Sequence, residues 1–153
     1  MKASAPSDPL ESGAMLPERP LPGWTEAART ATATLYRDPS RPRCVYVWAD
    51  AGLRSELEDA EINERAIQAV LEEEGQPGAV FVFLDRFHGI SREARLRHFR
   101  GTSTTACVAL VGGTPLSRAL ASFTLGVFRP VMPVRLFGDL AEAEAWAQEH
   151  LQP

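Results

Sequence analysis

The sequence has few cysteines, no long apolar run and no excess of basic charge. Its two cysteines, Cys44 and Cys107, lie in apolar, β-branched stretches without CxxC or zinc-finger spacing, which predicts buried thiols of a reducing compartment. No apolar run approaches the roughly 18 residues of a membrane-spanning helix, and residues 1–9 lack the apolar segment of a secretory signal. We therefore expect a cytoplasmic protein without integral membrane insertion.

The net charge and the composition of the chain exclude further classes of protein. Sixteen basic against twenty acidic side chains leave a formal charge of −4, which argues against broad binding to nucleic acid. With 44% hydrophobic and 24% charged residues among 153, the chain has the composition of one globular domain. A domain of this size is large enough to fold without a metal or a disulfide.

The first thirty residues differ from the rest of the chain. They contain five of the twelve prolines and show neither a helical nor a strand period. We predict a weakly ordered tail over residues 1–30, followed by one domain over residues 31–153. The alternative is that Leu16, Leu21 and Trp24 pin the end of this tail onto the domain.

From residue 32 onward the pattern alternates between strands and helices. Residues 32–36 and 44–48 form a predicted hairpin, and two continuous apolar stretches predict central parallel strands that bury Val82 and Val108. The patterns predict an α/β sandwich of order ββαβαβαβα with a mostly parallel sheet. The later elements are expected at 56–74 (helix), 79–84 (strand), 91–100 (helix), 106–111 (strand), 115–127 (helix), 134–137 (strand) and 139–151 (a helix capped by Asp139). The first of these helices is expected to bury Leu57, Ala60, Ile67, Val70 and Leu71.

The loop at residues 85–91 follows a central strand, and ligands or partners of open α/β sheets usually meet such loops. Asp85, His88 and Ser91 stand at three-residue intervals, but the G-x-S-x-G elbow that would activate a serine is missing. The simpler interpretation makes Ser91 a helix N-cap and His88 a solvated side chain. A regulatory alternative is a phosphate on Ser91, close to Arg92 and Arg95.

Four arginines fall within nine positions of the helix that follows this loop. They form either a solvated helix face or a docking surface for an acidic protein partner or an anionic ligand. His98 has no second His or Cys at ligand spacing, so we predict neither a metal site nor a cofactor. The four are Arg92, Arg95, Arg97 and Arg100.

The turn at Gly112 and Gly113 leads from a strand into a helix. Its backbone amides, together with Thr114 and Arg118, form a candidate anion-binding site. The stretch lacks both the GxGxxG spacing and the Walker lysine. The alternative is a plain turn, with Thr114 as the cap and Pro115 at the first helical position.

The helix at 115–127 is apolar around more of its circumference than packing on a sheet requires. Ala121, Leu125 and Phe128 lie outside its predicted core stripe, and Leu125 and Phe128 are therefore candidates for self-association as a homodimer. A helix that the N-terminal tail covers is the alternative. The predicted core stripe consists of Leu116, Ala119, Leu120, Phe123, Thr124 and Val127.

Several stretches of the chain resemble a known family. They are VFLD at 82–85, ISREAR at 90–95, VALV at 108–111, PLSR at 115–118, PVRLF at 133–137 and EAEAW at 142–146. With the order of elements over residues 32–151, they resemble the STAS-like fold of anti-sigma factor antagonists and of small bacterial STAS-like domains of unknown function. In the antagonists, a serine at the start of the helix after the central strand is phosphorylated by the partner kinase, and this surface docks the partner. The resemblance implies that role for Ser91.

We therefore expect a non-enzymatic cytoplasmic regulatory or scaffold domain that acts through protein contact and is switched by phosphate at Ser91. The alternative is a module that binds a small anion, a nucleotide or a lipid-like molecule between the sheet and the helix at 116–128. No constellation of residues supports an enzyme. The predicted partner-binding residues are Asp85, His88, Ser91, Arg92 and Arg95.

Overall fold

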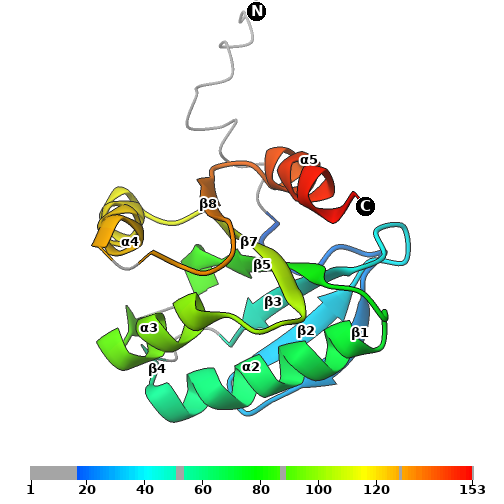
Figure 1. Ribbon diagram of the computed structural model, residues 1–153, viewed down its shortest axis with the longest axis horizontal. Coiled ribbons are helices and arrows are strands. Elements are labelled where there is room, and N and C mark those ends of the chain that lie inside the picture. Colours follow the sequence, from blue (N-terminus) through cyan, green and yellow to red (C-terminus); the bar gives the residue numbers. More distant parts are fainter. Residues whose placement is uncertain (1–16, 51–53, 87–88, 128, 153) are drawn as a thin grey trace, which may run out of the picture.

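A six-stranded sheet forms the centre of the protein (Figure 1). The computed structural model describes residues 17–50, 54–86, 89–127 and 129–152. The strands are β1 (Thr25–Arg29), β2 (Ala33–Arg37), β3 (Cys44–Ala49), β5 (Gly78–Phe83), β7 (Thr105–Val111) and β8 (Val134–Phe137), adjacent in this order. Pairing is antiparallel from β1 to β3 and parallel from β3 to β8. The predicted α/β class, its hairpin and its mostly parallel sheet are confirmed.

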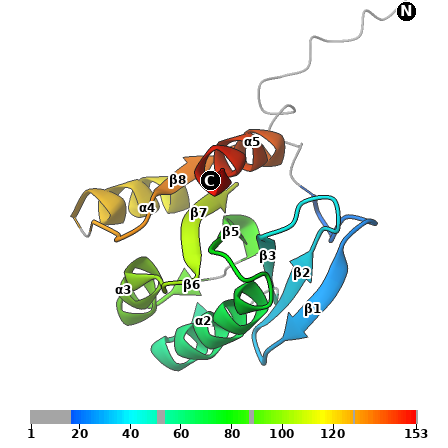
Figure 2. The same cartoon turned by 45° about the vertical axis from the view of Figure 1, so that its right-hand side comes forward.

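The helices occupy two layers and one edge. They are α2 (Leu57–Glu72), α3 (Arg92–Arg100), α4 (Pro115–Val127) and α5 (Leu140–Leu151). Helices α2 and α3 lie on one side of the sheet and α5 lies on the other, whereas α4 stands beside the edge strand β8 (Figures 1 and 2). A short parallel pair, β4 (Arg54–Ser55) with β6 (Gly89–Ile90), was not predicted and ties the start of α2 to the start of α3. No helix within the described ranges is long and apolar enough to cross a membrane.

Local signals fix the ends of these helices. The Asp139 carboxylate accepts the N–H of Ala141 at 2.7 Å and thereby begins α5, as predicted. At α2, Glu56 and Asp59 form a reciprocal capping box. Both devices place carboxylates on the N–H groups that the first turn of a helix leaves unpaired.

Two cores lie on opposite faces of the sheet, because successive residues of a strand point to opposite faces. On β3, Val45 and Val47 face α2 and join an aliphatic cluster that includes Leu35, Ile67 and Leu71. The other face is aromatic and is covered in part by α5. Its buried aromatic residues are Trp24, Tyr46, Trp48, Phe81, Phe83 and Phe137.

The predicted boundary of the tail at residue 30 is wrong. Residues Thr25–Arg29 form β1, which pairs with β2 through an irregular register at Ala27, and Trp24 is only 8% exposed. The Trp24 ring stacks on Tyr46 with a centroid distance of 4.2 Å. The alternative in which Trp24 pins this segment to the domain is thus confirmed for Trp24, whereas Leu21 is exposed. Leu16 lies outside the described residues, as does the rest of the segment 1–16.

Three helix and strand predictions also need correction. Val82 and Val108 are half-buried rather than buried, because α3 packs chiefly against α2 and not across these strands. Leu57, assigned to the core face of α2, is 40% exposed. Leu57 is the first residue of α2, and the buried residues of the helix begin one turn later at Ala60.

The predicted core stripe of α4 is wrong at two positions. Ala119 is exposed and Val127 is 55% exposed, while Leu125 is half-buried. The stripe assumed that α4 covers the face of the sheet, but α4 packs beside β8, so a different side of the helix meets the protein.

Candidate functional site

The loops at the carboxyl ends of β5 and β7 are joined by one hydrogen bond. Strand β5 runs into a short 3-10 turn, η2 (Leu84–Arg86), in which Asp85 is exposed. The Asp85 carboxylate accepts the backbone N–H of Gly113 at 3.1 Å. Gly112 and Gly113 have φ angles of 81° and 98°, a region that glycine adopts without the steric penalty of a side chain. The glycine turn therefore has a defined structural role, because it donates a backbone N–H to the Asp85 carboxylate.

The same contacts bear on the candidate anion site. The N–H of Gly112 donates to the Phe137 carbonyl at 2.8 Å, and the N–H of Gly113 donates to Asp85. An anion at this turn would have to displace a carboxylate that the protein already supplies. Arg118 is half-buried, and its guanidinium group lies beside Gly138. Thr114 is exposed and accepts the Arg118 N–H through its carbonyl as α4 begins. These contacts favour the plain-turn alternative.

Ser91 is the N-cap of α3. Its hydroxyl accepts the N–H of Ala94 at 3.1 Å, and its own N–H donates to the Ser55 carbonyl at 2.9 Å. The predicted cap is confirmed. Ser91 is 5% exposed, so a kinase can reach the hydroxyl only after the first turn of α3 opens.

Asp85 and Ser91 do not form a catalytic pair. The carboxylate binds a backbone N–H of the β7 loop and the hydroxyl binds a backbone N–H of α3. A nucleophilic serine instead needs a base within hydrogen-bonding reach. His88, the third member of the predicted group, lies outside the described residues. Across the described ranges, no group of three or more His, Cys, Asp or Glu side chains could hold a metal ion.

The arginines of α3 differ in exposure. Arg92 and Arg100 are exposed, whereas Arg95 and Arg97 are half-buried. The Nε atom of Arg95 is buried and has no hydrogen-bond partner among the described residues. Because Arg92 and Arg100 are eight positions apart on the helix, their Cα atoms lie about 12 Å apart along its axis and within one quarter of its circumference. They mark the two ends of a single outward stripe.

Helix α3 rests on an acidic helix. Over its length α2 has five carboxylates and one arginine, whereas α3 has four arginines and one glutamate. His98 Nδ1 lies 2.7 Å from the Oε1 atom of Glu64, whose side chain is almost fully buried. This pair explains His98 without a metal. It also joins α3 to α2 by a side-chain contact.

A buried polar cluster was missed by the sequence analysis. The Tyr46 hydroxyl donates to the Oε2 atom of Glu144 at 2.6 Å, and the Nε atom of Arg41 lies 2.6 Å from the same oxygen. Burial and this hydrogen bond raise the pKa of Tyr46, so the phenol stays protonated. The cluster ties α5 to the β2–β3 turn. The only sequence signal was a glutamate among the alanine and leucine residues that form the buried side of α5.

A second contact that the sequence did not predict lies at the carboxyl ends of β3 and β5, between Arg86 and the end of β3. The Arg86 guanidinium lies over the Trp48 ring, 4.7 Å from its centroid, and the Arg86 Nε–H donates to the Ala49 carbonyl at 2.9 Å. Such cation–π contacts stabilise an arginine against an aromatic face. Residues 48 and 86 are far apart in sequence, and no local pattern connects them. The contacts of Arg86 therefore stabilise the packing around Trp48 and give no indication of ligand binding.

Comparison with known proteins places the chain in a family without an assigned function. A solved structure from Shewanella loihica PV-4, an uncharacterized protein of the DUF3478 family with a SpoIIAA-like fold, matches with a TM-score of 0.48 and 14% sequence identity. The match covers 85% of this chain and 98% of that chain. No curated protein matches the sequence. Residues 46–151 match the domain of unknown function DUF7793, and the chain therefore belongs to the DUF7793 family.

Proposed function

We propose that the protein is a cytoplasmic, non-enzymatic regulatory or scaffold domain that docks an acidic protein partner on α3. The observation behind the proposal is the stripe that begins at Arg92 and ends at Arg100, both exposed, with Leu96 half-buried between them. Arginine forms bidentate contacts with carboxylates and is enriched at protein interfaces. A partner segment with two carboxylates about 12 Å apart fits the spacing of eight helical residues.

The rest of the surface around the strand ends supports contact rather than catalysis. Asp85, Ser91 and the Gly112–Gly113 amides are all engaged by the backbone or by each other. An acidic partner needs none of these groups. It needs the exposed guanidinium groups, whose long-range attraction raises the association rate.

A phosphate switch at Ser91 would act through the start of α3. The Ser91 hydroxyl caps the helix, so adding a phosphate removes or rearranges that cap and brings negative charge next to Arg92. The docking stripe begins at Arg92, and the modification would therefore weaken capture of an acidic partner. Ser91→Asp keeps a good N-cap and adds one charge, whereas Ser91→Ala removes the cap alone, so comparing the two separates charge from capping.

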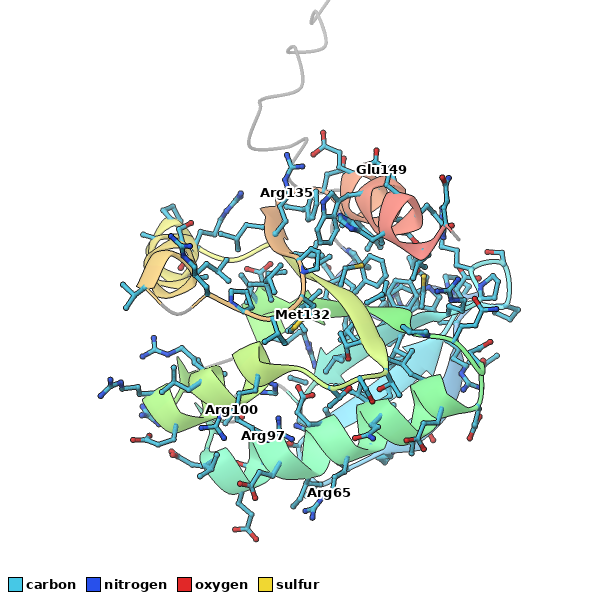
Figure 3. All side chains as sticks on the ribbon, viewed as in Figure 1. Arg65, Arg97, Arg100, Met132, Arg135 and Glu149 are labelled. Carbon is cyan, nitrogen blue, oxygen red and sulfur yellow. The ribbon has the colours of Figure 1, made fainter. Side chains whose placement is uncertain are left out.

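The test compares two double variants in capture from cell extract. Arg92→Glu with Arg100→Glu reverses both ends of the stripe, and Arg19→Glu with Arg65→Glu changes the net charge equally at exposed positions away from it. In Figure 3, Arg65 points outward from the side of α2 away from α3. We expect the stripe variant to lose acidic partners that the wild type and the control retain. For each recovered partner, the association rate should fall about tenfold or more at low salt and less at about 0.3 M salt.

Two outcomes would contradict the proposal. One is an unchanged set of partners and unchanged association rates for the stripe variant. The other is equal loss in the stripe variant and the control, which would show a response to net charge rather than to α3. Far-UV circular dichroism and urea midpoints of both variants establish that the fold is retained before the comparison.

A further inference from the structure

Strand β1 forms one edge of the six-stranded sheet. Among the described strands it pairs with β2 alone, and β8 forms the opposite edge. In Figure 2, β1 is the outermost strand and no labelled helix lies beyond it. An edge strand presents a row of backbone N–H and C=O groups to which another strand can bind. The β1 edge is therefore a surface for the addition of a strand.

The backbone groups that β1 directs outward belong to Glu26 and Arg29. The Thr30 N–H donates to the Ala33 carbonyl at 2.8 Å, and facing residues of an antiparallel pair alternate between hydrogen-bonded and non-hydrogen-bonded pairs. Arg29 precedes Thr30 and therefore directs its N–H and C=O away from β2. Glu26 faces Tyr36, which lies three residues after Ala33 on β2 and so directs its own groups toward β3. The N–H and C=O of Glu26 thus also point outward.

The irregular register of β1 decides which face of the sheet each of its side chains occupies. The β2 residues that face Glu26 and Arg29 are two positions apart, so these two charged side chains lie on the same face. On the opposite face, Ala27 and Ala28 both pack against the aliphatic cluster beside α2. The extra residue of the bulge therefore makes the order of faces symmetric about the midpoint between the two alanines.

The sequence around this midpoint is complementary to itself. Residues 25–30 read TEAART. When a second copy runs antiparallel about the midpoint, threonine faces threonine, glutamate faces arginine and alanine faces alanine. Opposite charges are favourable neighbours across two strands. Facing residues must also lie on the same side of a sheet, and the symmetric order of faces created by the bulge meets this condition.

We propose that the chain forms a symmetric dimer in which β1 of one copy pairs antiparallel with β1 of another. The two-fold axis passes between Ala27 and Ala28, and the sheets of the two copies become one continuous sheet. Glu26 of each copy exchanges backbone hydrogen bonds with Arg29 of the other. Within one copy the two side chains form an exposed ion pair at 2.5 Å. In the dimer, two such pairs lie side by side, so each charge has an opposite charge both along its own strand and across the axis.

The features of β1 favour a second copy over other occupants. Charged side chains and bulges usually protect an edge strand from pairing. Here both features match a second copy of the chain in one register, and each copy has a single β1 edge, so the pairing closes at a dimer. In Figures 1 and 2, α3 and β1 lie on opposite sides of the molecule. The dimer therefore leaves the Arg92–Arg100 stripe uncovered, and the two proposals fail independently.

Sedimentation equilibrium of the full chain, at concentrations up to about 0.5 mM, tests the pairing, since a contact of this size is expected to have a micromolar dissociation constant. Glu26→Arg and Arg29→Glu each bring only like charges together at the axis, and each should weaken the dimer about tenfold or more. The double variant restores the alternation of charge and should recover dimerisation.

Matched controls change the same charges near the opposite edge of the sheet. Glu142→Arg lies in the first turn of α5 and Arg135→Glu lies on β8, and both positions are exposed. Neither control should alter the dissociation constant by more than about twofold, since exposed charges beyond a Debye length are largely screened. Urea midpoints of all variants establish that the fold is retained.

A proline tests the backbone contact separately from the charge. Arg29→Ala removes only the side chain, whereas Arg29→Pro also removes the outward N–H and leaves the hydrogen bonds to β2 in place. We expect Arg29→Ala to weaken the dimer and Arg29→Pro to abolish it over the same concentrations. Equal dimerisation of the two variants would show that the copies meet at another surface.

Amide hydrogen exchange distinguishes a second copy from a segment of the same chain. Exchange of the Glu26 and Arg29 N–H groups should slow as the protein concentration rises. Protection that does not depend on concentration would assign the β1 edge to residues 1–16 and overturn the proposal. A wild-type chain that stays monomeric up to about 0.5 mM would also overturn it. The same holds for a dimer that neither single charge variant weakens more than its control, or that the double variant fails to restore.

Discussion

Replacing Trp24 with alanine tests whether the segment before β1 is an integral part of the domain. The indole is 8% exposed and lies against Tyr46, Trp48 and Phe83, with centroid distances of 4.2, 6.4 and 6.0 Å. A tryptophan buries roughly 150–250 Å². At about 25 cal/mol per Å², its removal corresponds to about 4–6 kcal/mol. This is an upper limit, because the unfolded chain already shields part of its apolar surface, so we expect a loss of about 3–5 kcal/mol.

Urea unfolding followed by far-UV circular dichroism measures this loss without relying on the fluorescence of the residue removed. With a slope of about 2 kcal/mol per M, the midpoint should fall by about 2 M. Leu21→Ala, at a position that is 40% exposed, is the matched control and should lose less than about 1 kcal/mol. Trp24→Phe should lose less than half as much as Trp24→Ala, because it keeps a stacked ring and removes an Nε1–H that has no partner among the described residues. A Trp24→Ala midpoint equal to that of Leu21→Ala would refute the packing described for this segment.

Three further predictions concern the core and the end of α3. Tyr46→Phe should destabilise the fold by about 1–3 kcal/mol in urea unfolding, since it removes a buried hydrogen bond to the Glu144 carboxylate, which then keeps the half-buried Arg41 as its partner. Gly101→Ala should cost about 1 kcal/mol or more, because φ is 61° and the new Cβ meets Met132, and Met132→Ala in the same chain should recover part of the loss. Burial, reinforced by the nearby Glu144 charge, raises the pKa of the Cys44 thiol to about 12. The contribution of this thiol is complete below about pH 8.5 and is lost as pH rises toward 12, so Cys44→Ala should flatten the alkaline decline of the urea midpoint.

Sequence patterns predicted the structure correctly where the conformation of a segment depends mainly on its own residues. An uninterrupted apolar run predicts a central parallel strand, and β5 and β7 are central parallel strands, although Val82 and Val108 are only half-buried. The carboxylate of Asp139 and the hydroxyl of Ser91 act on N–H groups two or three residues away, so their capping roles follow from local sequence. These features need no knowledge of the rest of the fold.

Patterns failed where the environment of a residue is set by a distant segment. The sequence TEAAR has little strand character, and it becomes β1 because β2 offers an unpaired edge and Trp24 anchors the chain beside it. The apolar circumference of α4 gave no indication that the helix would stand beside β8 and expose Val127. Likewise, the glycine turn looked like an anion site until Asp85, twenty-eight positions earlier, was found to occupy its amide.

The charge pattern links the fold to the proposed docking surface on α3. Helix α3 contacts α2 through the close pair of His98 and Glu64, whereas Arg92 and Arg100 are exposed. Salt should thus weaken the capture of an acidic partner by Arg92 and Arg100 while leaving the buried contact of Glu64 largely intact, because buried pairs are screened far less than exposed ones.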